Sequence, residues 1–223
     1  MAKRKGEAYT KAYRYLAIAG EASVLLKATL EQCIYHEKMA GAVDREIKKL
    51  QRSNKTESST RYISAFGMRG YERLSLPTEA QTVVSVSDEY GSAMIYLSLF
   101  EKRMANTCGY IYRVFPSCFA DSEIEGVLLP RNKMLFLKDA PLADRQINMR
   151  RFLNTKAIAH HRKDIRTAMK IRTQMIAEAE NALHEVGEAH FALEKIYGDA
   201  MNFKEKEKYT NKVIDRVLSC LKG

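Results

Sequence analysis

Residues 145–172 read RQINMRRFLNTKAIAHHRKDIRTAMKIR, and this stretch decides the expected fold. It contains neither Gly nor Pro, the residues that most often interrupt a helix. Nine of its residues are basic and only Asp164 is acidic, which gives a local charge of +8. The basic residues are Arg145, Arg150, Arg151, Lys156, Arg162, Lys163, Arg166, Lys170 and Arg172. We expect them to form a partner-binding surface, because Arg binds carboxylates and phosphates well; the alternative is a solvated helix face.

The helical pattern continues from about Leu142 to Tyr197. Its apolar residues follow a heptad-like spacing: Ile158, Ile165, Ala168, Met175, Ala179, Ala182, Val186, Ala189, Leu193 and Ile196. Residues 173–199 carry six acidic residues and one Lys, so their local charge is −5. The pattern predicts one rod of roughly 80 Å that is positive at one end and negative at the other.

Outward from this rod, most of the chain also has helical periodicity. The spacing of apolar residues predicts helices over residues 7–52, 60–74, 75–113 and 203–221. The expected fold class is therefore mostly α, an extended long-helix structure or antiparallel helical bundle. We expect an N-terminal helical region at 1–113, an irregular apolar connector at 114–141, and a long C-terminal helical region at 142–223.

The connector contains three of the four prolines in the chain. Its two short apolar runs predict either a small hairpin or extended segments packed on helices. We interpret it as a docking element whose residues are Val127, Leu128, Leu129, Met134, Leu135 and Phe136.

Composition points to an acidic partner. The chain has 223 residues, a net charge of +10 and a pI of about 9.4. Such a charge favours nucleic acid, an anionic membrane surface or an acidic protein surface, although a protein can also be basic without such a partner. A secretory signal and a run of roughly 18 apolar residues are both missing from the sequence. We therefore expect a bacterial or host cytoplasm and no membrane partner.

The sequence lacks the motifs of phosphate-binding loops and nucleophile elbows. The four cysteines show no paired metal-ligand spacing. Glu180, His184 and Glu188 fall on one helix face, where they could bind a metal, but we interpret them as solvated surface residues that pair along the helix. We expect no catalytic residue, no metal, no cofactor and no enzymatic activity.

Residues 88–113 read DEYGSAMIYLSLFEKRMANTCGYIYR. This segment resembles the central helix of satellite-phage capsid size-determination proteins. The resemblance rests on Glu89-Tyr90, Phe100-Glu101-Lys102, Cys108 and Tyr112-Arg113. It implies an external scaffolding protein that self-associates on a procapsid and binds phage coat protein.

Two functions follow as hypotheses. The first is a non-enzymatic structural or assembly protein that forms homo-oligomers and binds an acidic protein surface, for which a capsid scaffold is the specific version. The alternative is a basic helical protein that binds nucleic acid through residues 145–172 and the N-terminal residues 3–15, where basic residues and tyrosines are interleaved.

Overall fold

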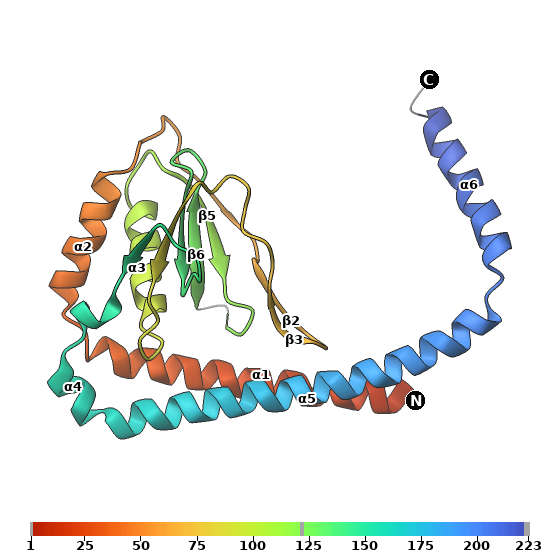
Figure 1. Cartoon of the computed structure of the whole chain (residues 1–223), viewed down its shortest axis with the longest axis horizontal. Helices are drawn as coiled ribbons and strands as arrows, with labels where there is room; N and C mark the ends of the chain where they lie inside the picture. The colour runs from red at the N-terminus through yellow and green to blue at the C-terminus, as the bar shows by residue number, and fades with distance from the viewer. Residues whose placement is uncertain (1, 121–122, 221–223) are drawn as a thin grey trace.

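The computed structural model describes residues 2–120 and 123–220, and it shows an α/β body joined to a long pair of helices (Figure 1). The elements in chain order are α1 (Ala2–Glu31), α2 (His36–Lys48), β1 (Glu57–Thr60), β2 (Ser64–Gly67), β3 (Gly70–Arg73), β4 (Thr82–Val86), α3 (Ala93–Ala105), β5 (Ile111–Pro116), β6 (Ile124–Leu129), β7 (Met134–Lys138), β8 (Arg145–Ile147), the 3-10 helix η1 (Met149–Phe152), α4 (Thr155–His160), α5 (Arg162–Ala200) and α6 (Phe203–Cys220). The prediction of a mostly α bundle is wrong, because six strands form one mixed sheet and two more form a hairpin.

The six-stranded sheet has the order β1-β5-β6-β7-β4-β8. Strand β4 pairs in parallel with both β7 and β8, and β1 pairs in parallel with β5. Strand β6 is antiparallel to β5 and to β7, so it alone runs against the others. The carboxyl ends of β4, β7 and β8 therefore share one edge of the sheet. That edge faces the helix pair, as the residues lining the cavity between them show.

Helix α3 packs on one face of the sheet and α2 packs against α3, so that together they enclose the main core (Figure 1). There the ring of Phe100 lies 4.4 Å from that of Phe136, measured between ring centroids. A smaller cluster around Phe115 and Leu128 lies on the other face, where Ile63 and Ala80 of the segment between β1 and β4 pack against it.

The long helix expected at 75–113 is replaced by β4, α3 and β5. Residues 82–86 read TVVSV, and β-branched side chains favour a strand that is buried on both faces. Gly91 and Gly109 flank α3 with φ angles of +89° and +93°, which no right-handed helix contains. The segment that resembles the capsid proteins thus comprises a loop, α3 and part of β5. The expected boundary at 113/114 falls inside β5.

The helix expected at 60–74 is also wrong, because β2 and β3 form an antiparallel hairpin there. Gly70 closes its turn with a φ of +81°.

The first helix, expected to run without a break to residue 52, ends at Glu31. Ile34 forms a β-bridge with Leu153, and the backbone N–H of Tyr35 donates to the carbonyl of Phe152 at 2.8 Å. The N–H of Asn154 donates to the carbonyl of Cys33 at 2.8 Å. These bonds to a distant segment replace helical hydrogen bonds, and α2 begins afresh at His36.

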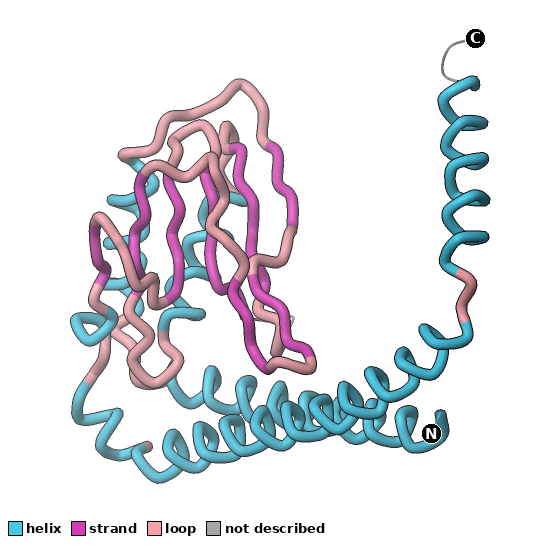
Figure 2. The backbone as a smooth tube through the Cα atoms, turned by 45° about the vertical axis from the view of Figure 1, so that its right-hand side comes forward, coloured by secondary structure: helices cyan, strands magenta, loops and turns pink. Residues whose placement is uncertain are grey.

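The rod expected over residues 142–197 is partly confirmed. Its first third becomes β8, η1 and α4, while α5 is a single helix of 39 residues. Helices α1 and α5 run antiparallel and side by side in both views, and we call this pair the rod (Figures 1 and 2). The predicted stripe of α5 faces α1: the buried residues of the two helices include Ala12, Ala19, Leu26, Ile165, Ala168, Ala179, Ala182 and Val186. Small side chains let the two helices approach closely.

The predicted C-terminal helix is confirmed as α6. It follows a break at residues 201–202 and projects away from the rest of the chain in both views (Figures 1 and 2). None of the helices in the described ranges combines the length and the hydropathy that crossing a bilayer requires.

Candidate functional site

The nine basic residues predicted to bind a partner are spread over β8, η1, α4 and α5 and do not lie on one helix. Three of them are paired within the chain. Arg145 binds Glu46 of α2, Arg150 binds Glu89, and Arg172 binds Glu123. Arg145 and Arg172 thus link separate elements of the fold, whereas the side chain of Arg150 stays largely exposed. That these three arginines bind a partner stays a prediction.

The pairing of Arg172 joins the rod to the body. Its Nη2 lies 3.3 Å from a carboxylate oxygen of Glu123, which is buried directly before β6. Its Nε donates to the hydroxyl of Ser23 on α1 at 2.8 Å, and its guanidinium lies over the ring of Phe119. Arg172 therefore links α1 and α5 to the segment that leads into β6.

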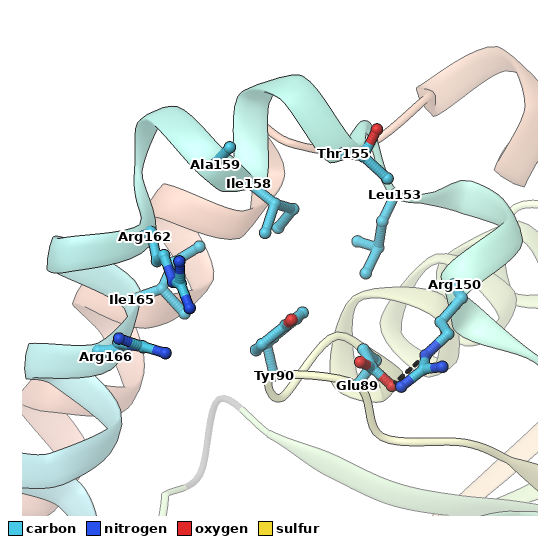
Figure 3. Close-up of a pocket in the computed structure, with 10 residues that line it drawn as sticks. All are labelled: Glu89, Tyr90, Arg150, Leu153, Thr155, Ile158, Ala159, Arg162, Ile165 and Arg166. Atoms are coloured by element: carbon cyan, nitrogen blue, oxygen red, sulfur yellow. Dashed lines mark hydrogen bonds and ion pairs between the residues drawn. The ribbon is translucent and has the colours of Figure 1, made fainter.

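The other six basic residues are exposed: Arg151, Lys156, Arg162, Lys163, Arg166 and Lys170. Two of them, Arg162 and Arg166, line a cavity of about 490 Å³ where α4 and α5 meet the body, and their side chains point into it (Figure 3). We call this cavity the arginine pocket. It is lined by Glu89, Tyr90, Arg150, Leu153, Thr155, Ile158, Ala159, Arg162, Ile165 and Arg166.

The arginine pocket has apolar walls and a cationic side. Leu153, Ile158 and Ile165 supply aliphatic surface, and Tyr90 faces them across the cavity (Figure 3). The Nε of Arg150 lies 2.9 Å from a carboxylate oxygen of Glu89, and this hydrogen bond raises the pKa of Arg150. Arg162 and Arg166 have no carboxylate partner among the described residues. Three guanidinium groups and one carboxylate leave the pocket with an excess of two positive charges.

A network of hydrogen bonds holds the loop that carries Glu89 and Tyr90. Asp88 accepts from the backbone N–H of Ala93 at 2.9 Å and pairs with Lys138 at 2.7 Å. The N–H of Asp88 donates to the carboxylate of Asp139 at 2.8 Å. Tyr90 is held in the left-handed region with φ at +57°, a conformation that persists only where neighbours impose it. This wall of the pocket is therefore preorganised.

The predicted docking element is interior. Its residues lie in β6 and β7, whose antiparallel pairing confirms the hairpin interpretation. Val127, Leu128, Leu129, Leu135 and Phe136 are fully buried and Met134 is half-buried. They form the middle of the sheet, so the expectation that they contact a partner is corrected.

Exposed apolar side chains gather instead on a region that we call the arm, residues 191–220. They are Phe191, Ile196, Tyr197, Met201, Phe203, Tyr209, Val213, Ile214, Val217 and Leu218. No residue of α6 is buried. Ile196 occupies the same stripe of α5 as Ala182 but is 59% exposed, because this part of α5 extends past the described part of α1 (Figure 1).

Glu180, His184 and Glu188 remain on the surface of α5, where the His184 ring lies 3.9 Å from Glu188. The described residues include no cluster of three His, Cys, Asp or Glu side chains that could hold one metal ion.

The sequence did not single out Glu89, Tyr90 or Leu153 as pocket residues. A signal was present: the run of β-branched residues at 82–86, then Asp88 to Gly91, then a helix is the strand–loop–helix order that places ligands at the carboxyl edge of an α/β sheet. Comparison of the chain with family models, with curated proteins and with solved structures finds no match.

Proposed function

We propose that this chain is a structural assembly protein that binds an acidic, helical protein partner through its arm. The observation that carries the proposal is the apolar stripe of α5, which continues past α1 and is not covered there by any of the described helices. In the rod this stripe is fully buried at Ala182 and Val186, and in the arm it is exposed at Ile196. Burying a large aliphatic side chain contributes about 1.5–3 kcal/mol, so a partner that covers the stripe gains stability.

Helix α6 supports the same conclusion. Its apolar face is formed by two pairs of residues on consecutive turns, Val213 with Ile214 and Val217 with Leu218. Each of the four side chains is 45–55% exposed. An amphipathic helix with its apolar face in water is typical of a helix-in-groove contact. Contiguous exposed apolar surface of this kind marks interaction sites in folded proteins.

Charge indicates the chemistry of the partner. Helix α6 carries five basic residues against three acidic ones, and the whole chain has a net charge of +10. A second copy of the chain would bring two strongly positive molecules together, which opposes association. An acidic partner would instead be attracted, and its charge would speed the encounter. The resemblance to capsid size-determination proteins adds coat protein as one candidate of this class.

To test the proposal, a photo-crosslinking residue replaces Val217 in cells that make the protein, and the crosslinked partner is identified. The complex is then reconstituted from purified components, and its affinity is measured. We expect Val213→Lys combined with Val217→Lys to weaken binding at least about tenfold, because two charges would enter an apolar contact. The matched control is Val213→Leu combined with Val217→Leu, which keeps the stripe and should bind normally. A Ser219→Lys variant adds charge beside the stripe and should change affinity about twofold or less.

Three results would overturn the proposal: equal binding by the lysine double variant, a partner that is basic, or a homodimer that the lysine double variant abolishes. Nucleic-acid binding is tested separately by mobility shift with generic DNA and RNA. Binding that falls steeply with salt and survives the lysine double variant would favour the alternative function.

A further inference from the structure

The arginine pocket combines two arginines with aliphatic walls, and neither the packing of the rod nor the proposed contact of the arm explains this combination. Its two unpaired arginines lie on consecutive turns of α5, and their side chains project toward the same space (Figure 3). Like charges at positions i and i+4 repel each other and destabilise a helix. A bound anion would relieve that repulsion by accepting hydrogen bonds from both guanidinium groups.

The opposite side of the cavity requires a different chemistry. Leu153 and Ile165 belong to the main core and expose only a small part of their surface into the pocket, while Ile158 packs half-buried beside them. Aliphatic walls favour an apolar ligand body by excluding water from it. The volume of about 490 Å³ lies within the range of small-molecule sites.

The pocket is built from segments that are independently fixed. Asn154 caps α4 by accepting from the N–H groups of Lys156 and Ala157. Ser87 accepts from the N–H of Met149 at 2.9 Å, which ties the loop before Tyr90 to η1. A ligand would therefore lose little free energy in ordering the site.

We propose that the arginine pocket binds an organic carboxylate with an aliphatic body. The carboxylate lies between Arg162 and Arg166, and the aliphatic part lies against Leu153, Ile158 and Ile165. Glu89 does not oppose this arrangement, because its charge is neutralised by Arg150 at 2.9 Å. The proposal is independent of the assembly function, which concerns the arm at the other end of α5.

The test is isothermal titration calorimetry of the full chain with decanoate below its micelle concentration. We expect saturable binding of decanoate, and binding weaker by about tenfold or more for decanol, which lacks the charge, and for inorganic phosphate, which lacks the aliphatic body. Equal affinity for decanol would remove the role of the arginines. Equal affinity for phosphate would remove the role of the apolar walls.

Variants locate the binding. Arg162→Gln combined with Arg166→Gln should weaken decanoate binding at least about tenfold. The matched control, Lys163→Gln combined with Lys170→Gln, removes the same charge from exposed residues of α5 outside the pocket and should have an effect of about twofold or less. Equal losses in the two double variants would show diffuse attraction and overturn the proposal.

Ile158→Phe provides a test that leaves charge unchanged, because the larger side chain fills the cavity and should reduce binding. Circular dichroism confirms that each variant is folded. The arm variant Val213→Lys with Val217→Lys should bind decanoate normally. Loss of binding in that variant would place the ligand on the arm, whereas failure of the assembly function would leave decanoate binding intact.

Discussion

Arg145 and Glu46 form a two-pronged ion pair that joins β8 to α2 across 99 positions of sequence. Nη1 of Arg145 lies 2.8 Å from one carboxylate oxygen of Glu46, and Nη2 lies 2.6 Å from the other. These hydrogen bonds lower the pKa of Glu46 and raise that of Arg145. The planar guanidinium matches both oxygens, a geometry that Lys cannot reproduce.

The pair should make stability depend on pH. Because the pKa of Glu46 is lowered on folding, its contribution is fully present above its unfolded pKa of about 4.3 and is lost as pH falls through the folded value. Arg145→Gln should reduce the free energy of unfolding by about 1–2 kcal/mol at neutral pH, and this cost should shrink in acid. Chemical denaturation at several pH values measures it. The control is Lys163→Gln, at an exposed residue without a carboxylate partner in the described chain. If the cost of Arg145→Gln did not vary with pH, the pairing with Glu46 would not be its cause.

Close packing in the rod predicts sensitivity to added volume. Ala182 is buried against α1, so Ala182→Leu should force the helices apart and cost about 1–3 kcal/mol. Ala192 lies on the same helix but is exposed, so Ala192→Leu should change stability by about 0.5 kcal/mol or less. Thermal unfolding of both variants tests this difference. Equal effects would mean that the rod is loosely packed.

Two glycines should respond to alanine in opposite directions. A Cβ at Gly109 would lie 2.8 Å from the carbonyl oxygen of Ser53, and its φ of +93° disfavours any other residue. Gly109→Ala should therefore cost at least about 1–3 kcal/mol. Gly198 lies in α5 with open space around it, so Gly198→Ala should stabilise the helix by about 0.5–1 kcal/mol. Circular dichroism during thermal melting distinguishes the two, and stabilisation by Gly109→Ala would refute the turn geometry.

The cysteines should react with a thiol reagent in a fixed order. Cys108 and Cys220 are exposed, whereas Cys118 is half-buried and Cys33 is fully buried. Burial raises the pKa of Cys33 and of Cys118, which reduces their thiolate fraction. We expect two fast reactions, one slower reaction, and a fourth only after unfolding. Single Cys→Ser variants assign each phase, and fast labelling of Cys33 in the folded protein would be inconsistent with its position.

Local periodicity was enough to predict α6 and the buried stripe of α5. A helix places residues three and four positions apart on the same face, so the sequence itself records which side is apolar. For β6 and β7, the two apolar runs around Pro130 left a hairpin and extended segments packed on helices as alternatives, and the antiparallel pairing of the two strands selects the hairpin. The charge polarity along α5 was also readable, since it depends only on composition.

The sheet was not predictable in this way. Strand β4 is buried on both faces, so its apolar residues do not alternate with polar ones and cannot be distinguished from a helix stripe by spacing. Its partners, β7 and β8, lie more than 45 positions away, and hydrogen bonds to distant strands leave no local signal. The break between α1 and α2 likewise depends on Leu153, far along the chain.

The basic residues also separate what the sequence determines from what tertiary structure decides. Sequence alone determined that residues 145–172 are basic, because charge is a property of each side chain. Tertiary structure decided which charges are used internally: Arg145 is neutralised by Glu46 and Arg172 by Glu123, while Arg162 and Arg166 face a cavity that Tyr90 closes from another part of the chain. Coulomb attraction falls with separation in space and not along the chain, so only the folded arrangement determines which arginines remain free to bind.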